Sequence, residues 1–283
     1  MNIREELNRA AARLARAGSG SPRLDAEILL TFFLNIERLE LYKAPERILT
    51  AEEAAGFEKL LERRCQGEPV AYIIGFKEFW SLLFLVNREV LIPRPETEIL
   101  VEETLQAVQD ESWAAPRILE IGVGSGAITV ALARELPEAI LTATDIAAGA
   151  LALARENARR HGVAARIDFR CGDLWTPVEG TFDLIVSNPP YISATDFSRL
   201  PRGVKDYEPR QALLAGAAGT ACHRAIIAGS VRYLKKGGWL LMEMGEGQGA
   251  ELTELLKQAA VYERRAVRCD YGGAERVIRA RKG

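Results

Sequence analysis

The feature that most constrains this chain is a regular alternation of strand-like and helix-like segments from Arg117 onward. Short runs of β-branched and apolar residues predict strands, and longer segments with helical apolar spacing separate them. The predicted strands are 117–122, 140–145, 167–173, 182–190 and 239–245, and the predicted helices are 127–136, 149–162, 220–238 and 251–259. Such alternation indicates an open, mainly parallel α/β sheet. Two strand-like runs on either side of Gly272-Gly273 predict an antiparallel hairpin that closes it.

The first 75 residues show a different pattern, which predicts helices without strands. A Gly-Ser-Gly run at 18–20 interrupts the first helix, and Ser21 followed by Pro22 is typical of the start of the next one. Thr50 with Glu53 is the signature of a capping box that opens a third helix. These residues contain no catalytic constellation, so we expect a small helical module.

Residues 79–92 are aromatic and β-branched, and they predict two short strands that form a hairpin between the two regions. Pro93 and Pro95 then interrupt regular structure. We therefore expect a helical domain over 1–75, a β-hairpin linker over 76–95 and an α/β domain over 96–283.

Charge and hydropathy restrict the classes of function. The chain has 283 residues, with 37 Lys+Arg, 39 Asp+Glu and a net charge of −2. Domains that grip nucleic acid over a long footprint are usually strongly basic, so we expect no direct DNA binding. No apolar run approaches the ~20 residues of a membrane span, and the N-terminus lacks the apolar core of a signal peptide. We expect a cytoplasmic protein that acts as a monomer.

The cysteines and histidines do not indicate a metal site. The four cysteines are widely spaced, with no C-x-x-C pair, which argues against zinc and against a disulfide framework. His161 and His223 lie in helix-like stretches, where a surface or hydrogen-bonded histidine is the favoured interpretation. We expect chemistry that uses neither a metal nor a thiol.

A glycine-rich loop follows the first strand of the α/β region and opens a helix. Its residues are Gly122-Val123-Gly124-Ser125-Gly126. In this context, glycines let backbone N–H groups approach a ligand closely. The loop also fits the dinucleotide-binding fingerprint, and a tight turn without any ligand remains an alternative.

Acidic residues near the loop narrow the choice of ligand. Asp145 ends the next strand, at a position that suits an acceptor for the ribose hydroxyls of a dinucleotide or another adenosine. Glu120 lies just before the loop, where its charge would repel a pyrophosphate but not a sulfonium such as S-adenosylmethionine. Asp173 follows the third strand, where it could accept a hydrogen bond from an adenine amino group.

A second motif, Asn188-Pro189-Pro190-Tyr191, follows the fourth strand. Ligands of open α/β sheets bind beyond the carboxyl ends of the strands, so this segment should lie beside the glycine loop. The two prolines remove backbone donors and leave carbonyl acceptors. A planar –NH₂ group could donate to the Asn188 side chain and to the Pro189 carbonyl while Tyr191 packs on its face. The alternative is a rigid turn that only ends the strand.

A long loop from 192 to 219 comes next, and loops of this length are usually functional. Its basic residues Arg202, Lys205 and Arg210 either contact an anionic partner or are simply solvated charges.

Taken together, these motifs make the chain resemble the peptide chain release factor N5-glutamine methyltransferases, the HemK/PrmC family, over most of its length. The N-P-P-Y motif alone is shared with DNA adenine methyltransferases, and the I-P-R-P-E-T-E segment is far more specific. The similar segments are Gly67-Glu68-Pro69, Tyr72-Ile73-Ile74-Gly75, Glu78-Phe79-Trp80, Leu91-Ile92-Pro93-Arg94-Pro95-Glu96-Thr97-Glu98, the glycine loop, Asn188-Pro189-Pro190-Tyr191, Tyr207-Glu208-Pro209, Asp270-Tyr271-Gly272 and Glu275-Arg276.

The resemblance implies a seven-stranded class I S-adenosylmethionine-dependent methyltransferase fold, with 96–283 as the catalytic domain and 1–75 as the domain that docks the substrate. It implies methyl transfer to the N5 amide of the glutamine in the Gly-Gly-Gln motif of class 1 peptide chain release factors. Leu174 stands where some members carry an aromatic residue. The expected cofactor residues are Glu120, Gly122, Val123, Gly124, Ser125, Gly126, Asp145, Asp173, Leu174 and Asn188. The expected substrate residues are Asn188, Pro189, Pro190 and Tyr191, of which Asn188, Pro189 and Tyr191 are the expected catalytic residues.

Three other functions are weighed against this one. A DNA adenine methyltransferase shares the chemistry, but the net charge and the lack of a separate basic domain count against it. A NAD-dependent oxidoreductase would explain the glycines and Asp145 but gives the N-P-P-Y motif no role. A non-catalytic binding module of the translation machinery would not need to bind S-adenosylmethionine.

Overall fold

The computed structural model describes the whole chain, from Met1 to Gly283. The chain forms two compact units. The first comprises Met1–Phe76 together with Pro201–Tyr207, and the second comprises Lys77–Leu200 and Glu208–Gly283. No helix in either unit combines the length and the apolar character needed to cross a bilayer.

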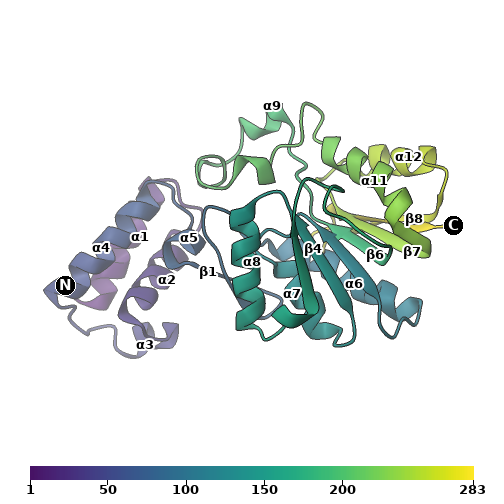
Figure 1. The fold of residues 1–283 in the computed structure, drawn as a ribbon. Helices are drawn as coiled ribbons and strands as arrows, with labels where there is room; N and C mark the ends of the chain where they lie inside the picture. Colours follow the sequence, from purple (N-terminus) through teal and green to yellow (C-terminus); the bar gives the residue numbers. More distant parts are fainter. The chain divides into compact units, whose positions relative to one another are not determined.

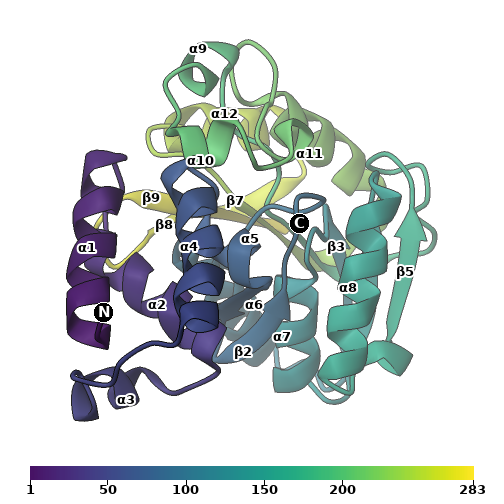
Figure 2. The ribbon, with the colours of Figure 1, turned by 90° about the vertical axis from the view of Figure 1, so that its left-hand side faces the viewer.

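The first unit is helical, as the sequence pattern predicts. Its helices are α1 (Ile3–Arg16), α2 (Pro22–Leu34), α3 (Arg38–Lys43), α4 (Ala51–Cys65), α5 (Val70–Ile74) and α10 (Arg202–Lys205). Asn2 and Thr50 open α1 and α4 with capping boxes, each closed by a glutamate in the first turn. Helices α1, α2 and α4 pack together (Figure 2), and their apolar faces form one core that includes Leu7, Leu14, Leu29, Phe57 and Leu61.

The second unit is built on a seven-stranded sheet with the order β5-β4-β3-β6-β7-β9-β8. The strands are β3 (Arg117–Ile121), β4 (Ile140–Asp145), β5 (Ile167–Cys171), β6 (Phe182–Ser187), β7 (Leu234–Glu243), β8 (Tyr262–Cys269) and β9 (Glu275–Lys282). The first five are parallel to one another, and β9 is antiparallel to both β7 and β8. The predicted parallel sheet with a closing hairpin is thus confirmed.

Helices cover both faces of this sheet (Figure 1). One apolar core joins the sheet to α6 (Glu98–Asp110), α7 (Ala127–Glu135) and α8 (Ala148–Arg160), and the other joins it to α11 (Ala221–Tyr233) and α12 (Gly249–Gln258). In β3, Ile118 lies in the first core and Leu119 in the second, because successive strand residues point to opposite faces. Burial on both faces explains why these strands are apolar runs rather than alternating patterns.

The hairpin is present, but its strands lie earlier in the linker than the strands expected within 79–92. Its strands are β1 (Phe76–Phe79) and β2 (Leu82–Leu85), and the turn residues Trp80 and Ser81 have φ of +54° and +55°. Such left-handed pairs are usually Asn-Gly or Asp-Gly, so this turn had no sequence signal. The turn former Asn87 instead makes its own turn after β2, where its side chain accepts the Glu89 N–H at 2.9 Å.

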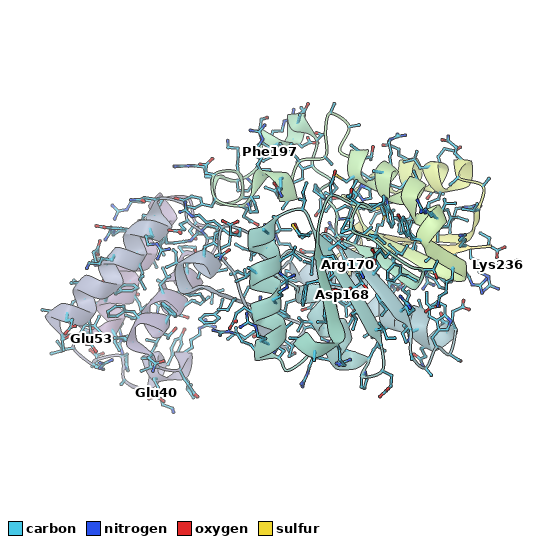
Figure 3. All side chains as sticks on the ribbon, viewed as in Figure 1. Glu40, Glu53, Asp168, Arg170, Phe197 and Lys236 are labelled. Atoms are coloured by element: carbon cyan, nitrogen blue, oxygen red, sulfur yellow. The ribbon has the colours of Figure 1, made fainter.

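Two further predictions need correction. The helix predicted over 220–238 ends at Tyr233, and the residues that follow begin β7. The 192–219 segment is not a structureless loop, since it contains α9 (Ala194–Phe197), α10 and a 3₁₀ turn. Two of its basic residues have partners. The Arg210 guanidinium lies 5.0 Å from the ring centre of Phe197, and Arg202 pairs with Asp206 at 3.4 Å. The Phe197 side chain is labelled in Figure 3.

Asn157 in α8 ties the hairpin to the glycine loop. Its Nδ2 donates to the Leu85 carbonyl at 3.0 Å and to the Ser125 carbonyl at 2.8 Å, and its Oδ1 accepts the Leu85 N–H at 2.8 Å. The side chain is fully buried. A primary amide supplies two donors and an acceptor in one plane, which is what these three backbone groups require.

We predict that Asn157→Ala lowers the free energy of unfolding by about 3 kcal/mol, because it removes the partner of one buried and two partly buried backbone groups. Asn157→Asp should lose a similar amount at neutral pH, since a carboxylate cannot donate to the two carbonyls. Urea denaturation measures both values. Gln106→Ala, which removes an exposed amide on α6, is the control and should change little. Losses under about 1 kcal/mol in both Asn157 variants would contradict this role.

Candidate active site

The register of the parallel strands brings the predicted site residues together at one edge of the sheet. Ile121 at the end of β3 lies beside Thr144 of β4 and beside Ser187 of β6. The Ser187 hydroxyl donates to the Ile121 carbonyl at 2.7 Å, which ties these two strand ends together. The residues that come next along these three neighbouring strands are the glycine loop, Asp145 and Asn188. All three therefore lie at the same edge of the sheet.

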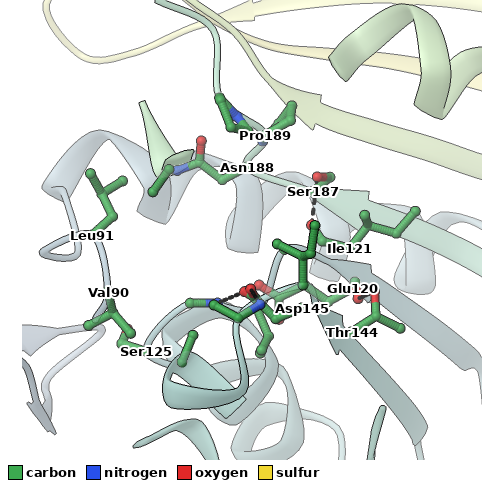
Figure 4. Close-up of a pocket in the computed structure, with 18 of the residues that line it drawn as sticks. Val90, Leu91, Glu120, Ile121, Ser125, Thr144, Asp145, Ser187, Asn188 and Pro189 are labelled. Carbon is green, nitrogen blue, oxygen red and sulfur yellow. Dashed lines mark hydrogen bonds between the residues drawn. The ribbon is translucent and has the colours of Figure 1, made fainter. Parts of the chain in front are cut away.

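A cavity of about 320 Å³ opens at this edge, within the size range of small-molecule sites. Asn188 and Pro189 lie on one side of it, and Ser125 and Asp145 lie on the opposite side (Figure 4). All the predicted site residues except Gly126 and Tyr191 line this cavity. They are Glu120, Gly122, Val123, Gly124, Ser125, Asp145, Asp173, Leu174, Asn188, Pro189 and Pro190.

Glycine is needed at each of the three loop positions for a different structural reason. All have positive φ, at +79° for Gly122, +52° for Gly124 and +84° for Gly126. A Cβ on Gly122 or Gly124 would meet nothing within 4 Å, so these two leave the backbone open. A Cβ on Gly126 would lie 3.2 Å from the Ala154 Cβ. Gly126 therefore allows α7 to approach α8 closely.

The Asp145 carboxylate is fixed in place by hydrogen bonds from two backbone N–H groups, one of them in the glycine loop. Its Oδ2 accepts the Gly124 N–H at 2.9 Å, and its Oδ1 accepts the Ala147 N–H at 2.9 Å. Each carboxylate oxygen can accept two hydrogen bonds, so both retain a free lone pair. The carboxylate is thus held by the backbone and can still accept hydroxyl donors from a ligand in the cavity.

Glu120 is buried beneath the loop, with 2 % of its surface exposed. It accepts a hydrogen bond from the Thr129 hydroxyl of α7. Burial raises its pKa to about 8, and the charge of Asp145 acts in the same direction. In the ligand-free protein, burial thus disfavours the negative charge that the sequence predicts for Glu120. A cation bound nearby would favour the ionised form.

Asn188 projects from the end of β6 at the cavity (Figure 4). Its Nδ2 donates to the Thr97 hydroxyl oxygen at 3.1 Å. Thr97 also lines the cavity and stands at the start of α6. Pro189 and Pro190 follow Asn188 and carry no N–H, so this wall of the cavity offers acceptors.

Tyr191 is turned toward a buried acid. Its hydroxyl donates to Glu243 Oε1 at 3.3 Å, and its backbone carbonyl accepts from the Gln248 side chain at 3.1 Å. Burial and the charge of Glu243 raise the pKa of Tyr191, so it stays a neutral phenol. Burial also raises the pKa of Glu243 to about 7, with Thr97, Arg276 and Tyr191 opposing that shift.

Three cavity or support residues carry no signal of their own in the sequence: one adjoins Asp145, and two come from segments far apart in the chain. Ile146 follows Asp145 in the cavity wall with 56 % of its surface exposed, which is unusual for an isoleucine. Glu208 is buried and accepts both the Ile92 N–H, at 3.1 Å, and the guanidinium of Arg94, which lines the cavity. The segments that contain Arg94 and Glu208 belong to the family resemblance, but nothing in their spacing indicates that they meet.

No cluster of three or more His, Cys, Asp or Glu side chains is arranged to hold a metal ion. His161 and His223 each contact a backbone carbonyl through Nε2, at 3.0 Å to Leu83 and 2.8 Å to Glu243. The side chains that line the cavity offer carboxylates, the amides of Asn188 and Gln211, hydroxyls, the Arg94 guanidinium, the Cys222 thiol and apolar surface.

The raised pKa of Glu120 predicts a pH-dependent stability. Between the ordinary value of 4.5 and about 8, the folded chain holds a proton that the unfolded chain has released. The free energy of unfolding therefore falls as the pH rises through this window, by at most about 1.4 kcal/mol per pH unit for one group. Glu120→Gln cannot ionise and removes this loss, so the variant should gain stability relative to the wild type as the pH rises.

Urea denaturation of both proteins at several values from about pH 5 to about pH 8 measures this difference. Glu243 titrates in both proteins, so its contribution cancels. A stability difference that stays constant over the range would show that Glu120 ionises at its ordinary pKa.

Comparison with known proteins agrees with this architecture. The family model of the PrmC N-terminal domain matches residues 5–75, and that of the methyltransferase small domain matches residues 96–200. Among solved structures, the hMettl16 catalytic domain has a TM-score of 0.57 at 17% identity, with 82% of each chain covered. A methyltransferase from Pyrococcus furiosus has a TM-score of 0.51 at 18% identity, covering 80% of this chain and 99% of that one. These similarities show a methyltransferase fold.

Sequence relatives extend over nearly the full length. The release factor glutamine methyltransferase of Nitratidesulfovibrio vulgaris is 43% identical, covering 98% of this chain and 94% of the relative. The one of Koribacter versatilis is 40% identical, covering 100% of this chain and 99% of the relative. The one of Yersinia pestis is 44% identical, covering 98% of this chain and 98% of the relative. By this full-length similarity, the chain belongs to the release factor glutamine methyltransferase family.

Proposed function

We propose that this protein transfers a methyl group from S-adenosylmethionine to the side-chain amide nitrogen, N5, of the glutamine in the Gly-Gly-Gln motif of class 1 peptide chain release factors. The observation that carries the proposal is the single cavity that the glycine loop and Asp145 share with Asn188 and Pro189. In the reaction the sulfur–methyl bond breaks, a nitrogen–methyl bond forms, and the amide nitrogen loses one proton to solvent.

The residues on one side of the cavity fit an adenosyl sulfonium. Gly122 and Gly124 leave open space above the backbone, and Asp145 keeps lone pairs for ribose hydroxyls. The exposed side chain of Ile146 offers an apolar surface for a flat base, and Asp173 and Leu174 line the same region. When bound, S-adenosylmethionine supplies an electrophilic methyl group on a positively charged sulfur. That positive charge would favour the ionised form of Glu120, which lies beneath the loop and whose pKa is raised by burial.

The residues on the other side suit a primary amide. The side-chain oxygen of Asn188 and the carbonyl of Pro189 are two acceptors for its two N–H groups. An amide nitrogen is a poor nucleophile, so positioning the nitrogen in line with the methyl group is the main contribution that the protein can make. Acceptors on both N–H groups also stabilise the positive charge that develops on nitrogen as the new bond forms.

The first unit would supply binding to the release factor itself. It contains the matched PrmC N-terminal domain, and its surface exposes large apolar side chains such as Leu39 and Ile48. Release factors act in translation, so we place the reaction in the cytoplasm.

If the first unit recognises the folded partner, an intact release factor should be a far better substrate than a short Gly-Gly-Gln peptide. Steady-state kinetics with both substrates gives the two kcat/KM values, and the difference should lie mainly in KM because the chemistry is the same. Equal kcat/KM values for factor and peptide would contradict a docking role for the first unit.

The activity is tested by incubating the protein with isotopically labelled S-adenosylmethionine and a class 1 release factor. Fragmentation mass spectrometry should place one labelled methyl group on the Gly-Gly-Gln glutamine. A parallel incubation with duplex DNA separates this function from that of a DNA adenine methyltransferase. Label on DNA and none on the release factor would overturn the proposal.

We predict that Asn188→Ala lowers kcat by about 10²–10³, the scale for losing one aligned polar partner of the reacting group. Gln106→Ala, which also removes an amide but from the exposed face of α6, should keep wild-type turnover. Calorimetry with S-adenosylmethionine shows whether the variant still binds the cofactor. Wild-type turnover in Asn188→Ala would remove Asn188 from the mechanism.

A further inference from the structure

One side chain among those that line the cavity is basic, and it is Arg94. The lining also contains the carboxyl groups of Glu89, Glu120, Asp145 and Asp173. S-adenosylmethionine has two positive groups, the sulfonium and the α-ammonium, and one negative group, the α-carboxylate of its methionine part. Acidic side chains attract the first two groups and repel the third. The cavity therefore has a single side chain whose charge can hold the α-carboxylate.

The backbone that carries Arg94 is fixed on both sides. Pro93 precedes it and Pro95 follows it, and Arg94 itself is extended, with φ of −99° and ψ of 142°. A residue that precedes proline is restricted to such conformations. The Arg94 carbonyl accepts the Thr97 N–H at 3.1 Å, and the Thr97 hydroxyl accepts from the Asn188 side chain at 3.1 Å. The backbone at Arg94 is thus anchored close to the residue that is proposed to hold the substrate amide.

The guanidinium of Arg94 is held at one end and open at the other. Its Nη2 donates to Oε1 of Glu208, which is 5 % exposed, and the second oxygen of Glu208 accepts the Ile92 N–H at 3.1 Å. Glu208 therefore contacts Arg94 through one oxygen only. A guanidinium has five N–H donors, so most of them have no partner in the protein. The Arg94 side chain is 32 % exposed, and a ligand in the cavity can reach these donors.

The ion pair of Arg94 with Glu208 could instead serve only to join two distant segments of the chain. A buried ion pair is a poor source of stability, however, because the desolvation of two charges offsets most of their attraction. Such a role would also leave most of the donors unused. The place of Arg94 in an otherwise acidic cavity lining favours a role in ligand binding.

We propose that Arg94 binds the α-carboxylate of S-adenosylmethionine through the N–H groups that Glu208 leaves free. The inference rests on the proposed function and deepens it. A planar guanidinium matches the two oxygens of a carboxylate, which adds parallel hydrogen bonds to the charge attraction. The cavity then selects adenosyl ligands that carry the amino-acid carboxylate over ligands that lack it, such as decarboxylated S-adenosylmethionine.

The test measures dissociation constants by calorimetry, with the full-length protein and two ligands, S-adenosylmethionine and its decarboxylated form. The wild type should bind S-adenosylmethionine more tightly. Arg94→Gln should lower this preference, expressed as the ratio of the two constants, by about tenfold to a hundredfold, the scale of a charge-assisted pair. The affinity for the decarboxylated form should not fall, because that ligand has no carboxylate and the variant removes a charge that repels it.

Two further variants separate ligand binding from the joining of segments. Glu208→Gln breaks the same ion pair but keeps the guanidinium, so the ratio should stay at the wild-type value or rise above it. Arg94→Gln combined with Glu208→Gln replaces the ion pair with two neutral amides and leaves no buried carboxylate unpaired. This double variant should show the same lowered ratio as Arg94→Gln, and it provides the test if Arg94→Gln alone does not fold.

An unchanged ratio in Arg94→Gln or in the double variant would show that Arg94 acts only through the structure of the cavity wall, and would overturn the inference. A wild type that binds both ligands equally, or a ratio that Glu208→Gln lowers as much as Arg94→Gln does, would overturn it as well. Failure of the wild type to bind S-adenosylmethionine at all would instead overturn the proposed function, and this inference with it.

Discussion

The parallel pairing of β3 with β6, closed by the Ser187 hydroxyl on the Ile121 carbonyl, is the constraint on which the site depends. A slip of one residue in this register would turn every side chain of a strand to the opposite face, and both faces are buried under helices. The apolar cores thus fix the register. The register in turn fixes the distance between the glycine loop and Asn188, so the packing of the sheet determines the geometry of the cavity.

Two buried glutamates lie near the site. Glu120 lines the cavity beneath the glycine loop, and Glu243, at the end of β7, accepts a hydrogen bond from the Tyr191 hydroxyl at 3.3 Å. Burial raises the pKa of both carboxyl groups. The Thr129 hydroxyl donates to Glu120, whereas Glu243 Oε2 has no hydrogen-bond partner. A buried acid reduces stability when it ionises without a cationic partner, so the presence of Glu120 in the cavity wall is better explained by ligand binding than by folding.

Much of the fold could be predicted from the sequence, because the strands and helices of the second unit have strong periodicity and clear boundaries. The errors have local physical causes. The hairpin turn at Trp80 and Ser81 uses residues that rarely take positive φ, and the sequence offered the better turn former Asn87 a few positions later. The strand β7 begins within a run of lysines and glycines that resembles a helix end.

The site could be predicted only where its residues adjoin a strand. The glycine loop, Asp145 and Asn188 all follow strand ends, and the topology of a parallel sheet then brings them together. Thr97, Glu208 and Glu243 act through side-chain contacts between segments that are far apart in the chain, and no spacing rule relates them. Glu120 was identified, but its protonation depends on burial that a sequence does not display.

The most direct measurement is a crystal structure of the protein with S-adenosylhomocysteine and a Gly-Gly-Gln peptide. We predict that the glutamine side chain donates one N–H to Asn188 Oδ1 and one to the Pro189 carbonyl, both at about 3 Å, with its nitrogen facing the cofactor sulfur. A glutamine bound elsewhere, or an Asn188 side chain that presents its nitrogen to the substrate, would contradict the account.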